Sequence, residues 1–100
     1  MKYVLLSADN APSVYLVPDV VADNLREYCI AFCDHWLHES PDAKEYQLGD
    51  GVGYNEEDFI KYLNKWIFPE TPSLLIETLG WTASKSDVPA LYKNCEWFNF

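Results

Sequence analysis

The stretch that most constrains the fold is residues 19–39, which lies between two prolines. Pro18 directly precedes it, and proline is favoured around the first turn of a helix. Asp19 follows, and its negative charge suits the positive helix N-terminus. At the other end Ser40 precedes Pro41, and the residue before a proline is pushed out of the α region. The sequence therefore predicts a helix over residues 19–39.

One side of this predicted helix is apolar, because a helix advances about 100° per residue. The apolar stripe consists of Leu25, Cys29, Phe32, Cys33 and Trp36. His35 and His38 fall on the polar side. Since the cysteines and the histidines face opposite ways, they cannot share a metal ion or form a Cys–His nucleophile pair within this helix. We expect Cys29 and Cys33 to pack as small apolar side chains. Cys95 lies in a separate segment, and its position relative to the histidines stays open.

Three segments are predicted to be strands. Residues 2–7 and 13–17 are rich in strand-forming residues and are separated by a polar turn, which indicates an antiparallel hairpin. A third strand is predicted over 73–81, between Pro72 and Gly80. Its alternation is imperfect, so the pattern does not assign its buried face.

A second helix is predicted from Asn55 to Ile67, because asparagine is a good N-cap and acidic residues follow it. Its inward residues are expected to be Phe59, Leu63 and Trp66. Residues 40–54 form a long connection that contains three glycines and room for one helical turn.

The aromatic residues are expected to fill the core. Trp36, Trp66 and Trp81 fit core stripes better than a ligand-binding cage. After a short helix predicted over 88–94, the tail that contains Trp97, Phe98 and Phe100 should pack back across the sheet. The alternative for this tail is a docking peptide or a contact between two copies.

These elements predict an α+β fold in the order β-β-α-α-β. A small antiparallel sheet of about three strands would be packed by two helices, and residues 1–100 would form a single globular domain.

The negative charge is concentrated in the middle of the chain. The net charge is −9, and residues 34–58 alone carry −7, with Lys44 as their one basic residue. The acidic residues are Asp34, Glu39, Asp42, Glu45, Asp50, Glu56, Glu57 and Asp58. We expect them to form a surface ridge that repels nucleic acid and anionic membranes and favours a basic protein surface. The alternative is a solvated face that aids solubility.

Three hypotheses for function follow. The favoured one is a small acidic interaction module that binds a basic partner, as inhibitors and immunity-type proteins do. The second is a metal-dependent or small-molecule enzyme centred on His35, His38 and Glu39, since two histidines and a carboxylate can form a facial metal site. The third is a homo-oligomeric structural domain that uses an exposed sheet edge or the aromatic tail.

The motif search favours a non-enzymatic role without a cofactor or metal. One helix seldom forms a metal site alone, and the histidine spacing is not HExxH. Residues 48–58 lack the alternating oxygen ligands of a calcium loop. The chain has no nucleophile elbow, Rossmann fingerprint or zinc-ribbon spacing. Catalytic residues that converge only in the fold would escape this search.

The sequence also predicts a cytoplasmic location. No apolar stretch approaches the length of a membrane span. The apolar run at residues 3–6 is shorter than the core of a signal peptide. Three cysteines, an odd number, agree with reduced thiols.

Overall fold

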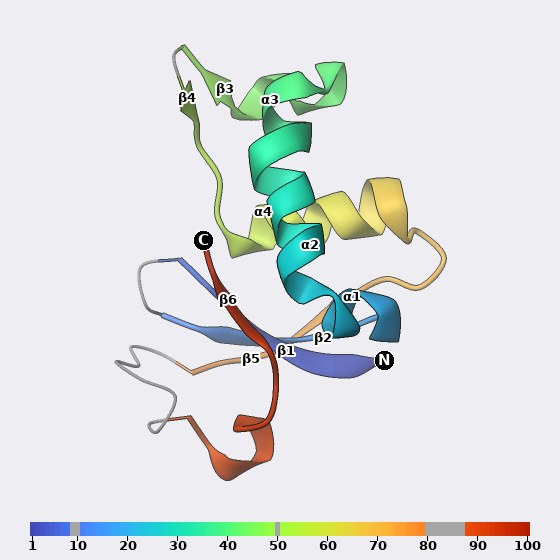
Figure 1. Cartoon of the computed structure of the whole chain (residues 1–100), viewed down its shortest axis with the longest axis vertical. Helices are drawn as coiled ribbons and strands as arrows, with labels where there is room; N and C mark the ends of the chain where they lie inside the picture. Colours follow the sequence, from blue (N-terminus) through green and yellow to red (C-terminus); the bar gives the residue numbers. More distant parts are fainter. Residues whose placement is uncertain (9–10, 50, 80–87) are drawn as a thin grey trace.

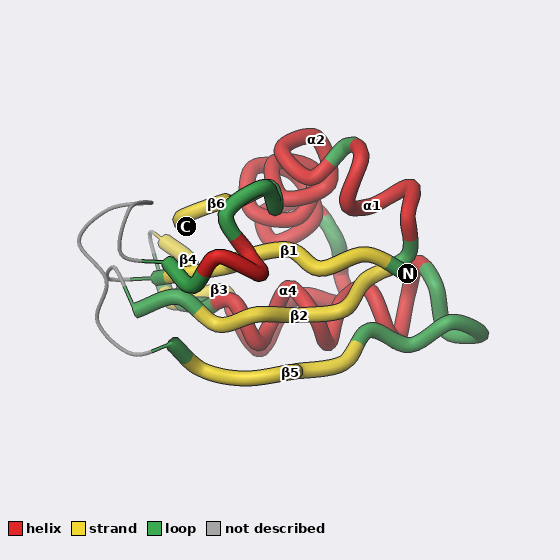
Figure 2. Tube along the Cα trace, turned by 90° about the horizontal axis from the view of Figure 1, so that it is seen from below, coloured by secondary structure: helices red, strands yellow, loops and turns green. Residues whose placement is uncertain are grey.

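The computed structural model of the chain describes residues 1–8, 11–49, 51–79 and 88–100. Within these ranges the fold is α+β, as the sequence predicts (Figure 1). Helices lie over one face of a four-stranded sheet, and a two-stranded sheet lies farther from it. The strand order of the larger sheet is β5-β2-β1-β6, and these strands are seen side by side in Figure 2. No helix in the described ranges is both long and apolar enough to cross a membrane.

The predicted hairpin is confirmed. β1 (Lys2–Ser7) and β2 (Ser13–Val17) pair antiparallel. β5 (Leu74–Thr78) pairs antiparallel with the other side of β2, with a register shift along the way. The strand predicted over 73–81 is therefore confirmed over 74–78, and residues 80 and 81 lie outside the described residues.

The tail forms a fourth strand that the sequence prediction missed. β6 (Trp97–Asn99) pairs parallel with β1, so the sheet is mixed and has four strands, not about three antiparallel ones. The Ser7 hydroxyl ties the two strands together: it donates to Asn99 Oδ1 at 2.7 Å and accepts from Trp97 Nε1 at 2.9 Å. A strand of three residues shows too little alternation to be recognised in a sequence.

Both faces of the hairpin are buried, which explains its weak alternation. The face toward the helices carries Val4, Leu6, Tyr15 and Val17. The opposite face carries Leu5 and Val14, which pack with Val88 and Tyr92. Tyr92 belongs to a 3₁₀ turn, Ala90–Tyr92, within the short helix predicted over 88–94. Since successive residues of a strand face opposite sides, a strand covered on both sides reads as a continuous apolar run.

The helix predicted over 19–39 is present but interrupted. It consists of α1 (Asp19–Asp23), α2 (Leu25–Ile30), a π-helical turn (Ala31–Trp36) and α3 (Leu37–Glu39). Asn24, with φ of −133°, breaks the run, and its side-chain amide donates to the Val20 carbonyl at 2.9 Å. Ser40 is extended, as the following proline requires.

The connection between the helices is more ordered than predicted. A 3₁₀ turn (Pro41–Tyr46) leads into a small hairpin of β3 (Gln47–Leu48) and β4 (Gly51–Val52). Gly49, with φ of +63°, lies between its strands in the left-handed region that favours glycine. After β4 the chain runs to α4 (Glu56–Tyr62), which continues as a π-helical turn (Leu63–Ile67).

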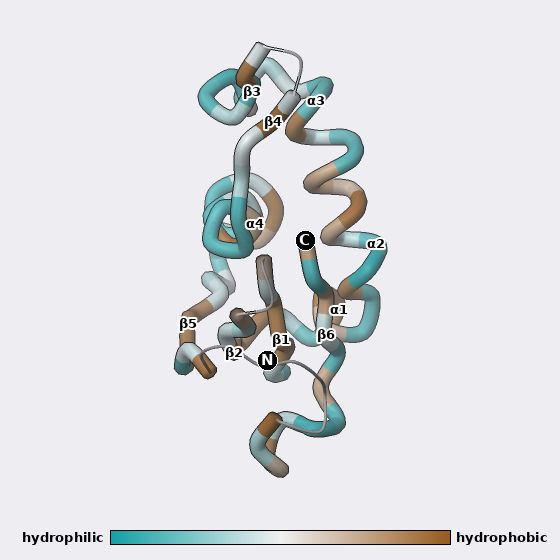
Figure 3. Tube along the Cα trace, turned by 90° about the vertical axis from the view of Figure 1, so that its left-hand side faces the viewer, coloured by the Kyte–Doolittle hydropathy of each residue, from teal (hydrophilic) through white to brown (hydrophobic). Residues whose placement is uncertain are grey.

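Phe32 is the centre of the main core. It is fully buried, and its ring lies 5.1 Å from that of Tyr62 and 5.6 Å from those of Phe59 and Tyr54. The helical run α1–α3, α4 and the segment after β4 therefore meet on one aromatic side chain. Figure 3 shows hydrophobic stretches on β1 and β2, and also on the edge strand β5.

Candidate functional site

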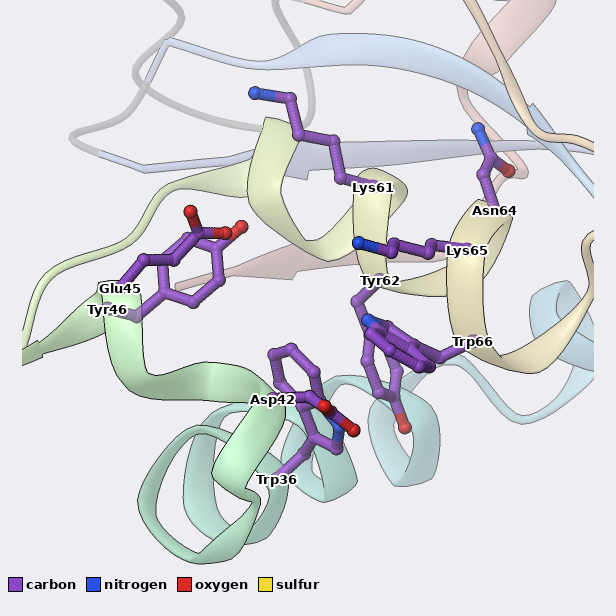
Figure 4. Close-up of a pocket in the computed structure, with 9 residues that line it drawn as sticks. All are labelled: Trp36, Asp42, Glu45, Tyr46, Lys61, Tyr62, Asn64, Lys65 and Trp66. Atoms are coloured by element: carbon purple, nitrogen blue, oxygen red, sulfur yellow. The ribbon is translucent and has the colours of Figure 1, made fainter.

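A surface groove of about 520 Å³ separates the 3₁₀ turn from α4 and its π-helical end. Its lining residues come from two stretches of the chain, 36–46 and 61–66, and Figure 4 shows them around the opening. They are Trp36, Asp42, Glu45, Tyr46, Lys61, Tyr62, Asn64, Lys65 and Trp66. In the described residues, this groove combines aromatic rings with charges of both signs.

Trp36 organises the aromatic part of the groove. Its ring centroid lies 5.0 Å from that of Tyr62, 6.2 Å from that of Tyr46 and 6.4 Å from that of Trp66. Trp36 also stacks on buried Phe32 at 5.9 Å, so the groove is built directly on the core. Tyr62 is nearly buried, whereas Trp66 is 42% exposed. The prediction that Trp66 belongs to the core is therefore wrong, and Trp81 lies outside the described residues.

The two rims of the groove carry opposite charges. Asp42 and Glu45 lie on the 3₁₀ turn, and Lys61 and Lys65 extend from the opposite side (Figure 4). Among the described residues, no ion pair within 4.0 Å joins the two rims. The Lys65 ammonium instead lies 5.0 Å from the centroid of the Trp66 ring, a cation–π contact.

Carboxylates from the 3₁₀ turn and from α4 affect the pKa of Tyr46, which lines the groove. Burial, the charge of Asp58 and a hydrogen bond to Glu45 raise the pKa of Tyr46 to about 12. The phenol therefore stays neutral across the physiological pH range. Asp58 lies in the first turn of α4, so α4 and the 3₁₀ turn both contribute negative charge here.

The structure divides the predicted acidic ridge into separate groups. Glu45 and Asp58 act on Tyr46, and Asp42 lines the same groove. Asp34 belongs to a different group, with Cys33 and Tyr54. Burial raises the pKa of the Tyr54 phenol first, and Cys33 and the charge of Asp34 add to this effect.

Three further acidic residues, Glu39, Glu56 and Glu57, do not line the groove. Glu56 and Glu57 are at the start of α4, close enough to the sheet that their charges add to burial in raising the pKa of Tyr15 to about 12. Glu39 is exposed on α3, and Asp50 lies outside the described residues.

The histidines are exposed, as the stripe predicts. His35 Nδ1 lies 3.9 Å from Glu39 Oε1, which is an ion pair only when the imidazole is protonated. Within the ranges that the structure describes, no group of three or more histidine, cysteine, aspartate or glutamate side chains could hold a metal ion. The enzyme hypothesis centred on His35, His38 and Glu39 thus lacks a converging ligand set there.

The cysteines behave as the helix geometry predicts. Cys29 is fully buried in the main core, and burial raises the pKa of its thiol strongly. Cys33 is partly buried beside it and also has a raised pKa, first because of burial and then because of Asp34. Cys95 packs with the smaller cluster of Leu5, Val14, Val88 and Tyr92.

Two surfaces bear on the homo-oligomer hypothesis. Phe98 and Phe100 pack against the main core, so the tail closes the fold as predicted. The edge strand β5 leaves Leu74 and Leu75 each 54% exposed and Ile76 39% exposed. Contact between two copies through an exposed sheet edge therefore stays a prediction, and β5 is the edge strand that would form this contact.

Sequence reasoning identified the carboxylates Asp42 and Glu45 but not the groove that they border. The missed residues are Tyr46, Lys61, Tyr62, Asn64 and Lys65. One signal was present: Trp36 and Trp66 both lie toward the ends of their predicted helices, where an aromatic side chain leaves the core most easily. Comparisons of the chain with family models, curated proteins and solved structures find no match.

Proposed function

We propose that this chain is a non-enzymatic interaction module that binds a basic surface of a partner protein. The binding residues are the carboxylates of 34–58, namely Asp34, Glu39, Asp42, Glu45, Asp50, Glu56, Glu57 and Asp58. The module would occupy its partner's basic surface as an inhibitor or immunity-type protein does. We also propose a cytoplasmic location, which the unbridged thiols of Cys29 and Cys33 support.

The observation that carries this proposal is that five of these carboxylates are exposed, and that four of the five have no ion-pair partner within 4.0 Å among the described residues. Asp34, Glu39, Asp42, Glu45 and Glu57 are all exposed. Among the described residues, the ion pairs within 4.0 Å give just one of these positions a partner, the histidine beside Glu39. Elsewhere the chain pairs its charges: Lys2 binds Asp23 at 2.6 Å, and the N-terminal ammonium binds Asp19 at 2.8 Å. The unpaired set is therefore free to act on a partner.

A basic partner fits this surface better than other classes of ligand. A net charge of −7 over residues 34–58 repels phosphate groups of nucleic acid and of anionic lipids. Complementary charges would steer a basic protein toward these carboxylates and raise the association rate. The partner could be a nucleic-acid-binding protein whose phosphate site these carboxylates occupy.

The test is capture of a partner from a lysate of the source cells, identified by mass spectrometry. Raising sodium chloride from about 0.1 M to about 1 M shortens the Debye length from about 10 Å to about 3 Å. We expect one stoichiometric partner that is lost at high salt. A complex that resists high salt, or no partner at either concentration, would contradict the proposal.

Matched variants distinguish binding by the carboxylates of 34–58 from a general effect of the net charge. One variant combines Asp34→Asn, Glu56→Gln and Glu57→Gln, outside the groove. Its control combines Glu27→Gln, Glu70→Gln and Glu96→Gln, which are exposed carboxylates outside 34–58. Both change the net charge from −9 to −6, by three charges. We expect the first variant to weaken binding more than the control. Equal weakening would mean that charge alone matters.

A further inference from the structure

We propose that the groove between the 3₁₀ turn and α4 is the anchor point of the complex, and that it binds an arginine side chain from an extended segment of the basic partner. This inference rests on the proposed function and adds the residue type that the module recognises. Arginine, tryptophan and tyrosine are the side chains that contribute most often to the energetic centre of an interface.

The aromatic rings supply the first half of the recognition. A guanidinium group is planar and stacks on aromatic faces, unlike the compact ammonium of lysine. The groove offers the exposed ring of Trp66 and, 6.4 Å from it, the ring of Trp36. Lys65 already places its ammonium 5.0 Å from the Trp66 centroid, so this ring face is in use as a cation site within the chain. An incoming arginine would displace Lys65 from it.

The carboxylates supply the second half. Asp42 and Glu45 lie on the 3₁₀ turn, at the rim of the groove that holds the aromatic rings, and both carboxylates are exposed (Figure 4). Neither has an ion-pair partner within 4.0 Å among the described residues. Arginine can donate to a carboxylate in a bidentate way, and such charge-assisted hydrogen bonds are about twice as strong as neutral ones. One guanidinium can therefore stack on a ring and bind a rim carboxylate together.

The opposite rim fits the main chain of the same segment. Lys61 and Lys65 line the side that faces the carboxylates, and their ammonium groups are hydrogen-bond donors. Carbonyl groups of an extended segment are suitable acceptors. The two cations also disfavour a second basic side chain on that side, so the groove should accept one arginine at a time.

The main test is calorimetric titration of the intact protein with two peptides. One is a blocked Gly-Arg-Gly-Gly-Arg-Gly peptide, and the other has lysine in place of both arginines. We expect the arginine peptide to bind on the order of tenfold more tightly, because only arginine combines stacking with bidentate hydrogen bonding. Equal affinity for both peptides, or no binding of either at millimolar concentration, would overturn the proposal.

Variants locate the binding in the groove. We expect Trp66→Leu to weaken the arginine peptide several-fold and to reduce its advantage over lysine. Asp42→Asn with Glu45→Gln should weaken it as well. The control, Asp34→Asn with Glu57→Gln, removes the same charge outside the groove and should have a smaller effect. If the control weakens binding as much, or if Trp66→Leu changes nothing, the arginine site is not in this groove.

These outcomes are distinguishable from failure of the proposed function. The proposed function fails when no salt-sensitive partner depends on Asp34, Glu56 and Glu57. The arginine inference fails when the peptides do not discriminate or Trp66 has no effect, even if that salt-sensitive partner exists. Folding of every variant is checked by comparing urea unfolding midpoints with the parent protein, and Trp66→Gln, which also removes the ring, replaces Trp66→Leu if the latter is unstable.

Discussion

At the scale of single residues, Asn55 determines where α4 begins. Its side chain accepts a hydrogen bond from the Asp58 amide at 3.1 Å, and the Asp58 carboxylate accepts one from the Asn55 amide at 2.9 Å. This reciprocal pair is a capping box, with asparagine and aspartate in place of the commoner serine and glutamate. It also holds Asp58, whose charge helps to raise the pKa of Tyr46, in the first turn of α4.

We expect Asn55→Ala to lower the free energy of unfolding by about 1 kcal/mol, because an orphan amide of the first turn loses its acceptor. Urea unfolding followed by circular dichroism measures this change. Asn94→Ala is the control: it removes an exposed asparagine from a region outside helix α4, and we expect less than about 0.5 kcal/mol. Equal effects of the two substitutions would mean that the cap does not stabilise α4.

Ser73 should behave in the opposite way. Its main chain is well satisfied, since its N–H donates to Asn64 Oδ1 at 2.6 Å and its carbonyl accepts from Asn64 Nδ2 at 3.1 Å. Its buried hydroxyl, however, has no hydrogen-bond partner among the residues that the structure describes. We expect Ser73→Ala to leave stability unchanged or to raise it by up to about 1 kcal/mol, because an unsatisfied buried hydroxyl is costly.

The matched substitution is Ser13→Ala, at a buried serine whose hydroxyl donates to Thr78 Oγ1 at 3.3 Å. It should lower stability, since it removes a hydrogen bond between β2 and β5. The sign of the difference between the two variants is the decisive result. A clear loss of stability in Ser73→Ala would show that its hydroxyl is satisfied in solution.

At the scale of elements, local signals and distant contacts differ in how well a sequence reveals them. The hairpin, the end at Ser40 and the cap at Asn55 depend on neighbouring residues, and all three were predicted. The break at Asn24 was missed because asparagine is tolerated within a helix and nothing adjacent forces an interruption. β6 was missed because its partner, β1, lies at the other end of the chain.

The groove was missed for the same reason as β6. Its residues lie on the π-helical turn that holds Trp36, on the 3₁₀ turn and on the end of α4, and only the fold brings them together. Periodicity showed that Trp36 lies on an apolar stripe of its helix. It does not reveal how much of the tryptophan side chain stays exposed once other elements pack against that helix. The acidic segment was visible because it is a property of composition, although its division around Tyr46, Tyr54 and Tyr15 was not.

The contribution of the C-terminal tail to the core can be measured through Phe100, which directly follows β6. Its ring lies 5.6 Å from that of Phe59, 5.8 Å from that of Tyr54 and 6.1 Å from that of Phe32. We expect Phe100→Ala to destabilise the protein by about 2 kcal/mol, less than a fully buried phenylalanine because its ring is partly exposed. Leu91→Ala, at a site that is 70% exposed, is the control and should be near neutral. Similar urea midpoints for the two variants would contradict the role of the tail in closing the core.

At the scale of the whole molecule, burial and negative charge act together on the phenols and thiols. Burial comes first in raising the pKa of Tyr15 and Tyr46, each to about 12, with acidic neighbours adding to it. A hydrogen bond to Glu77 at 2.5 Å does most to raise the pKa of Tyr92 to about 12. The pKa values of Tyr54, Tyr62, Cys29 and Cys33 are raised as well. The folded state therefore holds these protons more tightly than the unfolded chain does.

This sets the direction of the pH dependence. Below the ordinary thiol and phenol pKa values of 9.0 and 10.0, both states are protonated and these groups contribute their full stabilisation. Above them the unfolded chain releases its protons first, so stability falls as pH rises. We expect urea midpoints to be level between about pH 7 and about pH 9 and to fall steadily toward about pH 12. The part of the tyrosinate absorbance that comes from Tyr15, Tyr46, Tyr54, Tyr62 and Tyr92 should rise together with unfolding, not before it. Tyr92→Phe removes one of these phenols, so its urea midpoint should fall less steeply with pH above the ordinary phenol pKa. A flat profile in the parent protein would mean that the phenols ionise freely in the folded state.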